Sequence, residues 1–167
     1  PFIFIMEDIN YREVEGDLIQ LGKDGEFDVI GHGTNCFCTQ GAGLAPQMVK
    51  AFNTDRYLLE KEDRKGDINK LGTIEYHTNE FYTKPLTVVN AYTQYGFGRN
   101  HVGGKAIPLD YEALILCLRK MNRLFKGKHI GLPKIGCGLA GGDWSTVKGI
   151  IVKELKDCRV TVVVYNR

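Results

Sequence analysis

The sequence predicts an α/β fold in which a largely parallel sheet is covered by helices on both faces. Short runs of apolar and β-branched residues alternate along the 167 residues with longer segments in which apolar residues recur every three or four positions. This alternation extends over the whole chain, without an internal repeat or a low-complexity stretch. Strands that alternate with helices are typical of parallel sheets, which bind ligands at the carboxyl ends of their strands.

Each predicted strand is a short run rich in apolar and β-branched side chains. The runs are Phe2–Met6, Tyr11–Glu15, Phe27–Gly31, Gly72–His77, Leu86–Gln94, His129–Lys134 and Val160–Tyr165. All are much shorter than the roughly 18 to 20 apolar residues that a membrane-spanning helix needs. We therefore expect a soluble protein without a membrane partner.

Three segments have the periodicity of helices: Ala45–Phe52, with a broken continuation to Glu62, Tyr111–Phe125 and Ser145–Leu155. In the second of these, the apolar residues at spacings of three and four form one buried face. These residues are Leu114, Leu118, Met121 and Phe125. The third helix has either Asp143 or Ser145 as its N-cap.

Length and charge limit the classes of function. A chain of 167 residues is a natural size for one domain, which we expect to span residues 1–167. Charged residues make up 25% of the chain, but the formal net charge is only +2. No strong overall field then attracts nucleic acid or an anionic membrane, so any phosphate recognition must be local. We expect a monomer without general nucleic-acid binding.

The chain has five cysteines, an odd number without the spacing of a disulfide framework: Cys36, Cys38, Cys117, Cys137 and Cys158. Together with the lack of a secretion-signal pattern, this predicts reduced thiols and a cytoplasmic location. The pair Cys36-x-Cys38 near His32 lacks the two-residue spacer of a zinc knuckle, and no second knuckle follows. We expect no metal and no other cofactor.

The most informative segment is a strand that leads into a cluster of small residues. It reads Leu132-Pro133-Lys134-Ile135-Gly136-Cys137-Gly138-Leu139-Ala140-Gly141-Gly142, followed by Asp143-Trp144-Ser145. A strand that passes through a glycine loop into a helix start brings bare backbone N–H groups up to a phosphate. The pattern predicts a nucleotide or sugar-phosphate ligand.

Two further loops follow predicted strands. The loop His32–Pro46 is rich in glycine and hydrogen-bonding side chains, and it again leads into a helix. The loop Asn90–Arg99 adds aromatic side chains that can stack on a ring and an arginine that can meet an anion. Because the carboxyl ends of parallel strands meet at one end of a sheet, we expect the three loops to form the rim of one site.

Each of these features also has a purely structural interpretation. Glycine clusters after strands often only turn the chain, and neither glycine loop has the fingerprint of a dinucleotide-binding or P-loop motif. His32 can be a core histidine, and Asn35 can make an Asx-turn. Arg99 and Lys105 can be solvated loop charges. These alternatives stay open at the level of the sequence.

The order of five segments resembles the macrodomain family, in particular the single-domain branch that includes ADP-ribose-1″-phosphate phosphatases and terminal ADP-ribose protein glycohydrolases. The matching segments are Glu15–Leu18, Asn35 with Gly41–Ala45, Val89–Gln94, Asp110–Leu114 and Pro133–Trp144. The resemblance extends over nearly all of the chain from Tyr11 to Tyr165. It implies a three-layer α/β/α sandwich around a mixed six- or seven-stranded sheet.

The resemblance also implies ligand contacts. Asp17 resembles the acidic residue that accepts the adenine amino group, with the backbone of Leu18 beside it. Asn35 resembles the asparagine that hydrogen-bonds the distal ribose. Tyr165 resembles an aromatic residue that lies against adenine, although a simple strand-end role is equally open. Two loops would hold the ribose and wrap the diphosphate with N–H donors: Gly41, Ala42 and Gly43, and Gly136, Cys137, Gly138, Leu139 and Ala140.

Catalytic candidates follow from the same resemblance. His32 occupies the position of a histidine in the phosphatase-like and glycohydrolase-like branches, and is the first candidate for a general acid or base. Asn35 would help to fix the geometry of the reaction. The glycohydrolase branch has an aspartate where this chain has Ala140, which counts against an aspartate-dependent mechanism. No residue clearly matches the lysine of that branch, although Lys84 and Lys105 stand near candidate loops in the sequence.

We therefore predict an ADP-ribose-binding hydrolase that releases phosphate from ADP-ribose-1″-phosphate by attack of water at the distal ribose end. Two alternatives stay open: removal of ADP-ribose from a protein or nucleic acid, and recognition of ADP-ribose without turnover. A binding module has no need of His32, so this residue distinguishes turnover from binding alone. A zinc or redox role for Cys36, Cys38 and Cys137 is the least favoured interpretation.

Overall fold

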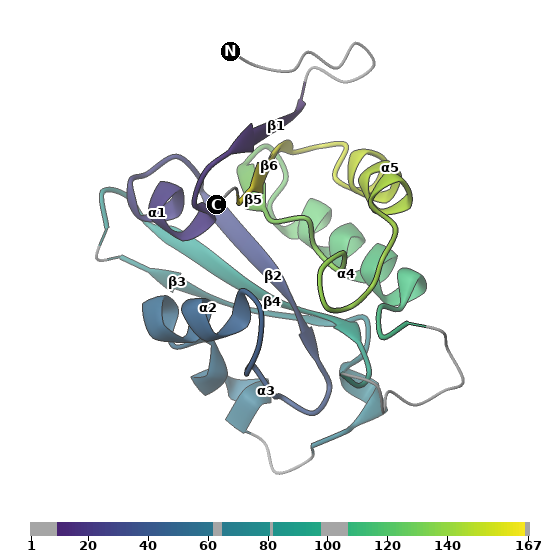
Figure 1. Ribbon diagram of the computed structural model, residues 1–167. Coiled ribbons are helices and arrows are strands. Elements are labelled where there is room, and N and C mark those ends of the chain that lie inside the picture. The colour runs from purple at the N-terminus through teal and green to yellow at the C-terminus, as the bar shows by residue number, and fades with distance from the viewer. Residues whose placement is uncertain (1–9, 62–64, 81, 98–106, 166–167) are drawn as a thin grey trace.

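The computed structural model describes residues 10–61, 65–80, 82–97 and 107–165. These residues form a six-stranded mixed sheet in the order β1-β6-β5-β2-β4-β3 (Figure 1). The strands are β1 Tyr11–Glu15, β2 Val29–Asn35, β3 Ile74–Asn79, β4 Leu86–Gln94, β5 His129–Leu132 and β6 Arg159–Val164. Neighbouring strands pair in parallel except β3 and β4, so β3 is an antiparallel edge strand.

Helices cover both faces of the sheet (Figure 1). They are α1 Leu18–Lys23, α2 Ala45–Phe52, α3 Leu58–Lys61, α4 Tyr111–Leu124 and α5 Trp144–Glu154, with two 3-10 turns, η1 Thr54–Arg56 and η2 Ile68–Lys70. Helices α4 and α5 share a core with Val29 of β2, whereas α1 and α2 share a second core with Ile30. Adjacent strand residues point to opposite faces, so the central strand β2 contributes to both cores. The result is the three-layer arrangement that was expected.

Most predicted elements are confirmed. The strands β1 and β4 and the helix α2 have the predicted bounds, and β3, β5, β6, α4 and α5 differ by one or two residues. The broken continuation after Phe52 is formed by η1 and α3. The predicted strand Phe2–Met6 lies outside the described residues. The short helix α1 was not predicted; its N-cap is Asp17, whose Oδ1 accepts the N–H groups of Ile19 and Gln20 at 3.0 and 3.2 Å.

Strand β2 continues further than predicted. We expected it to end at Gly31, with the polar residues that follow in a loop, whereas β2 pairs with β4 as far as Asn35 and Gln94. Polar side chains are tolerated in this central strand because they find partners inside the protein. One example is Thr34, whose Oγ1 donates to the carbonyl of Ala91 at 3.3 Å.

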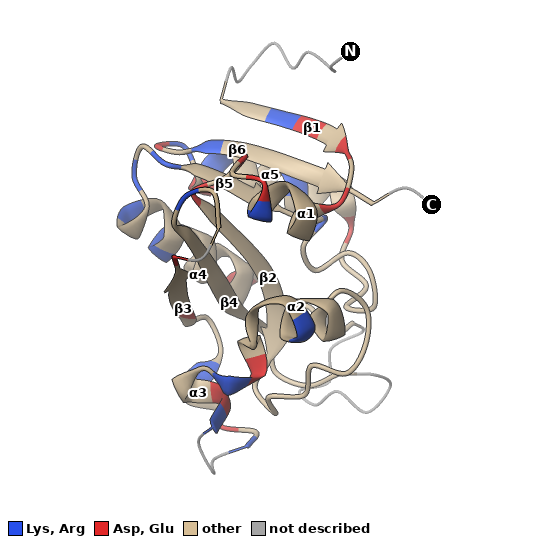
Figure 2. Ribbon diagram, turned by 90° about the vertical axis from the view of Figure 1, so that its left-hand side faces the viewer, with Lys and Arg blue, Asp and Glu red and all other residues tan. Residues whose placement is uncertain are grey.

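Basic and acidic residues are scattered over the elements in the ribbon view of Figure 2. Neither glycine loop carries a charge between Cys36 and Leu44 or between Ile135 and Gly142. Anion recognition by these loops would therefore rest on backbone N–H groups. Within the described ranges, no helix has both the length and the apolar composition that crossing a membrane requires.

Candidate functional site

The loops that follow β2 and β5 meet at the carboxyl ends of the parallel strands. A Cβ placed on Gly43 would lie 3.6 Å from Cδ1 of Leu139, so the two loops lie next to each other. Gly43 has a φ of +67°, a left-handed conformation that suits glycine. The Leu139 side chain is 74% exposed and is therefore available to a ligand that lies between the loops.

The loop after β5 folds back on itself through its glycines. The N–H of Gly142 donates to the carbonyl of Gly136 at 2.7 Å, and the N–H of Gly141 donates to the carbonyl of Gly138 at 3.1 Å. A Cβ on Gly142 would lie only 2.6 Å from the Gly136 oxygen. The close approach of backbone to backbone therefore requires glycine at position 142.

Three successive backbone N–H groups of this loop take no part in these hydrogen bonds. Those of Gly138, Leu139 and Ala140 make no backbone hydrogen bond within the described part of the chain. A run of N–H groups that are not bonded to other backbone groups is a typical anion-binding feature. The N-terminus of α5 is already capped, because Asp143 Oδ2 accepts the N–H of Thr146 at 2.9 Å. An anion would therefore be bound by the loop and not by the helix end.

The order of the strands arranges the candidate residues along the end of the sheet. Strands β1 and β6 pair at the far side, and Asp17 and Tyr165 follow them directly. Asp17 is exposed, and Tyr165 is 64% exposed. The side chain of Leu18 is buried in the core, so this residue offers a ligand only its backbone. Because β5 lies between β6 and β2, its glycine loop lies between these residues and Asn35.

The side chain of Asn35 shapes its own loop. Its Oδ1 accepts the N–H groups of Phe37 and Thr39 at 3.1 and 3.2 Å, and its Nδ2 donates to the Thr39 carbonyl at 2.8 Å. This is the Asx-turn that the sequence left open. Both polar atoms of the amide are therefore engaged within the loop, and the residue is only 6% exposed.

His32 is enclosed on the α2 side of the sheet and is 2% exposed. Its Nε2 lies 2.7 Å from Oδ1 of Asn90, whose Nδ2 donates to the carbonyl of Thr54 at 2.9 Å. Because the second bond fixes the orientation of the amide, we assign the imidazole proton to Nε2. Burial lowers the pKa of His32 to about 4, so the ring is neutral at pH 7.

A buried polar network beside the Asn35 loop was missed at the sequence level. Thr54 Oγ1 donates to Gln40 Oε1 at 2.7 Å, and Gln40 Nε2 donates to Glu60 Oε1 at 2.7 Å. The Tyr92 hydroxyl donates to the other oxygen of Glu60, which is 3% exposed. In the sequence Glu60 opens a run of charged residues that is typical of a solvated surface, so nothing there signalled a buried carboxylate.

Lys70 was missed for the same reason, and it fastens the Asn35 loop to η2. The residue is 3% exposed, and its Nζ donates to the carbonyl of Leu59 at 2.8 Å and to Cys38 Sγ at 3.3 Å. Cys38 has a φ of +57°, a strained conformation for a residue with a side chain. Burial raises the pKa of the Cys38 thiol, with a smaller opposing effect from Lys70.

The remaining candidates lie elsewhere. Lys84 forms an ion pair with Asp28 at 3.0 Å, near the amino end of β4 and so at the opposite end of the sheet from the loops. Arg99 and Lys105 lie outside the described residues. The side chain of Ala140 packs into the core. The five cysteines are free thiols, and the described ranges contain no cluster of three metal-binding side chains.

Comparison with known proteins gives both a relative and a fold. No family model matches the chain. The chain is 32% identical over 144 residues to an uncharacterized 17.5 kDa protein from the tk-vs intergenic region of Enterobacteria phage T4. The aligned region covers 84% of this chain and 86% of the phage protein.

Several solved structures with the same arrangement are macrodomains. The macrodomain of Mycobacterium tuberculosis DarG matches with a TM-score of 0.71 and 17% identity, over 94% of this chain and 98% of that one. Thermosipho africanus DarTG, solved in complex with ADP-ribose, matches with a TM-score of 0.71 and 17% identity, over 98% of this chain and 43% of that one. These matches confirm the predicted fold class. The chain thus belongs to the same family as the phage T4 protein, and its fold is the macrodomain fold.

Proposed function

We propose that this protein binds ADP-ribose across the carboxyl ends of its strands and acts as a hydrolase, with ADP-ribose-1″-phosphate as its favoured substrate. The proposal rests on one observation, the successive N–H groups of Gly138, Leu139 and Ala140, which make no backbone hydrogen bond within the described ranges. Such a run of donors suits a diphosphate. The fold shared with DarTG, solved in complex with ADP-ribose, supports the same ligand.

The positions of the other candidates support one orientation of the ligand. Asp17 and Tyr165 at the ends of β1 and β6 would hold adenine, with the carboxylate accepting its amino group. The diphosphate would lie against the loop after β5, and the distal ribose would reach the loop that Asn35 shapes. The strand order therefore matches the order of groups along ADP-ribose.

The reaction would depend on the positioning of a water molecule. Its oxygen attacks the terminal phosphorus, the bond from phosphorus to the ribose oxygen breaks, and ADP-ribose and inorganic phosphate leave. Holding water and target close to the attack geometry supplies several kcal/mol of the barrier reduction. His32 and Asn35 remain the candidates for this task. Since Nε2 of His32 is bound to Asn90, a general-base role would use Nδ1.

Binding of ADP-ribose without turnover is the second candidate function. The observation that favours it is that His32 Nε2 and both polar atoms of Asn35 already have partners inside the protein. Side chains held in this way can shape a binding site without taking part in chemistry.

One experiment separates these functions. Purified protein is incubated with ADP-ribose-1″-phosphate, with an ADP-ribosylated protein and with ADP-ribosylated DNA, and released phosphate and ADP-ribose are measured. We expect phosphate release that is lost in His32→Ala and kept in His77→Ala, a matched control on the exposed edge strand. Calorimetry should show that His32→Ala still binds ADP-ribose.

Other outcomes assign the function differently. Release of ADP-ribose from the protein or DNA substrate alone would replace the phosphatase assignment with a glycohydrolase. Binding of ADP-ribose without turnover of any substrate would favour the binding module. Absence of both turnover and binding would refute the proposal.

A further inference from the structure

A second pocket, of about 490 Å³, lies between the edge strand β3 and the segment where α2 passes into η1. Neither glycine loop contributes to its lining. The volume is within the range of roughly 300 to 1,000 Å³ of small-molecule sites. Glu75, His77 and Asn79 share one face of β3 because alternate residues of a strand point to the same side. The wall opposite is formed by Phe52 and Tyr57.

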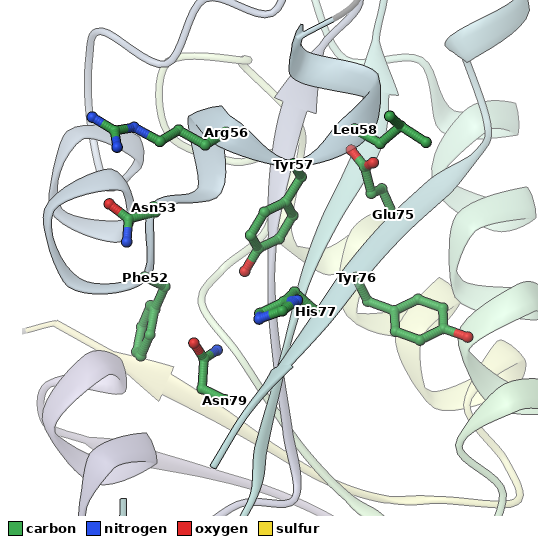
Figure 3. Close-up of a pocket in the computed structure, with 9 residues that line it drawn as sticks. All are labelled: Phe52, Asn53, Arg56, Tyr57, Leu58, Glu75, Tyr76, His77 and Asn79. Carbon is green, nitrogen blue, oxygen red and sulfur yellow. The ribbon is translucent and has the colours of Figure 1, made fainter. Parts of the chain in front are cut away.

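Two polar atoms in this pocket lack partners. Tyr57 is 9% exposed, and neither its hydroxyl nor Nδ2 of Asn79 has a hydrogen-bond partner among the described residues. Figure 3 shows the hydroxyl pointing toward His77 and Asn79, across from Phe52. Asn79 lies close enough to lower the pKa of Tyr57 in part, although the two side chains form no full hydrogen bond. Burial has the larger effect and raises this pKa, so the hydroxyl stays protonated and can donate.

Aromatic rings provide a surface for a planar group. The rings of Tyr57 and His77 lie 5.8 Å apart between centroids and are tilted by 48°. Phe52 also lines the pocket, but it is only 3% exposed because its ring packs in the core shared by α1 and α2. Aromatic side chains of this kind can stack on any of the nucleobases. Arg56 is exposed at the rim, where a guanidinium can bind a phosphate.

We propose that this pocket binds a nucleotide, with the base against the Tyr57–His77 pair and the phosphate at Arg56. A purely apolar ring would leave the Tyr57 hydroxyl and the Asn79 amide buried without partners, whereas the edge of a nucleobase carries acceptor atoms for both. The site is separate from the proposed ADP-ribose site and does not depend on it. A free nucleotide and a base within a single strand present the same chemistry.

The test maps binding without and with ADP-ribose. Backbone amide shifts are recorded with AMP, GMP, CMP and UMP, each alone and again after one equivalent of ADP-ribose has been added. We expect shifts at residues 52–58 and 75–79. Tyr57→Phe keeps the ring and should weaken binding about 3- to 10-fold, the effect of one hydrogen bond. Tyr76→Phe is the matched control. Tyr76 also lines the pocket, but its hydroxyl points away from Tyr57 and His77 (Figure 3), and its ring packs against Phe125 at 5.4 Å between centroids.

The outcomes are distinct. Absence of shifts at residues 52–58 and 75–79 up to millimolar nucleotide, or equal effects of Tyr57→Phe and Tyr76→Phe, would overturn the proposal. A nucleoside that binds as tightly as its nucleotide would refute the role of Arg56. If a short single-stranded oligonucleotide binds more tightly than a nucleotide, the ligand is a base within a single strand. If the two bind equally, the ligand is a free nucleotide. If ADP-ribose itself fails to bind, only the proposed function is lost, because the shifts report the second pocket directly.

Discussion

His32 is held at the centre of the sheet by contacts that leave it little freedom. Its Nε2 is bound to Asn90, and Asn90 is bound in turn to Thr54. The neutral ring is buried, and its pKa is lowered to about 4. This residue therefore couples the carboxyl half of β2 to η1, whatever part it takes in chemistry.

Replacing His32 with glutamine should make the stability less sensitive to acid. The folded-state pKa of about 4 lies below the ordinary value of 6.5, so the unfolded chain takes up a proton first as the pH falls. The neutral ring's stabilising contribution is therefore fully present above pH 6.5 and is lost as the pH falls toward 4. The loss reaches at most ~3 kcal/mol. Urea unfolding across this range measures it, and equal pH slopes for wild type and His32→Gln would contradict the assignment.

The hydroxyl of Tyr92 should contribute to stability through Glu60. In Tyr92→Phe one oxygen of a buried carboxylate loses its donor, so the free energy of unfolding should fall by about 1–3 kcal/mol. Tyr76→Phe is the control, because Tyr76 is 47% exposed and a surface substitution changes stability by about 0.5 kcal/mol or less. Chemical denaturation compares the two variants. Equal stabilities would show that the network contributes nothing measurable.

At the scale of the elements, the glycine loop after β5 depends on the close approach of Gly142 to the carbonyl of Gly136. Gly142→Ala would place a Cβ 2.5 Å from Cδ2 of Leu109 and 2.6 Å from the Gly136 oxygen, which should cost about 1–3 kcal/mol and weaken ADP-ribose binding. In α5 a Cβ on Gly149 would meet nothing within 4 Å. Gly149→Ala should therefore stabilise the helix by about 0.5–1 kcal/mol.

Denaturant unfolding and titration with ADP-ribose check this pair of variants. The expected pattern is lower stability and affinity for Gly142→Ala, and higher stability with unchanged affinity for Gly149→Ala. Full ADP-ribose affinity in Gly142→Ala would mean that the folded-back loop is not needed for binding.

Sequence periodicity predicted correctly those elements that are buried mainly through apolar contacts. The strand β4 and the helix α2 were placed correctly because continuous apolar runs and helical spacing report burial directly. The polar half of β2 and the Glu60 network were not found. Their partners come from distant segments, such as Asn90, which stands 58 residues beyond His32. A buried polar residue with a distant partner has the same local pattern as a loop residue.

The candidate site shows the same division. The two glycine loops were expected to face each other, and the closeness of Gly43 to Leu139 bears this out. The sequence did not predict which hydrogen bonds the individual side chains of the site make. Asn35 could bind a ribose or fold its own loop, and only the geometry shows that both of its polar atoms are used locally.

For the molecule as a whole, the order of the strands determines the layout of the site. The loop after β5 lies between the ends of β1 and β6 on one side and the end of β2 on the other. Segments from Asp17 to Tyr165, almost the full length of the described chain, therefore meet at one end of the sheet. In the proposed site the uncharged loops would leave anion recognition to backbone N–H groups, in line with the modest net charge of +2.

The most direct test is an amide chemical-shift titration of the protein with ADP-ribose. We expect binding of one molecule of ADP-ribose, with the largest shifts in Gly138–Ala140 and Gly41–Gly43 and further shifts at Asp17 and Leu18. The N–H groups of the β5 loop should move most because they would gain an acceptor on binding. Absence of binding, or shifts confined to residues 52–58 and 75–79, would contradict the assignment of the glycine loops as the ADP-ribose site.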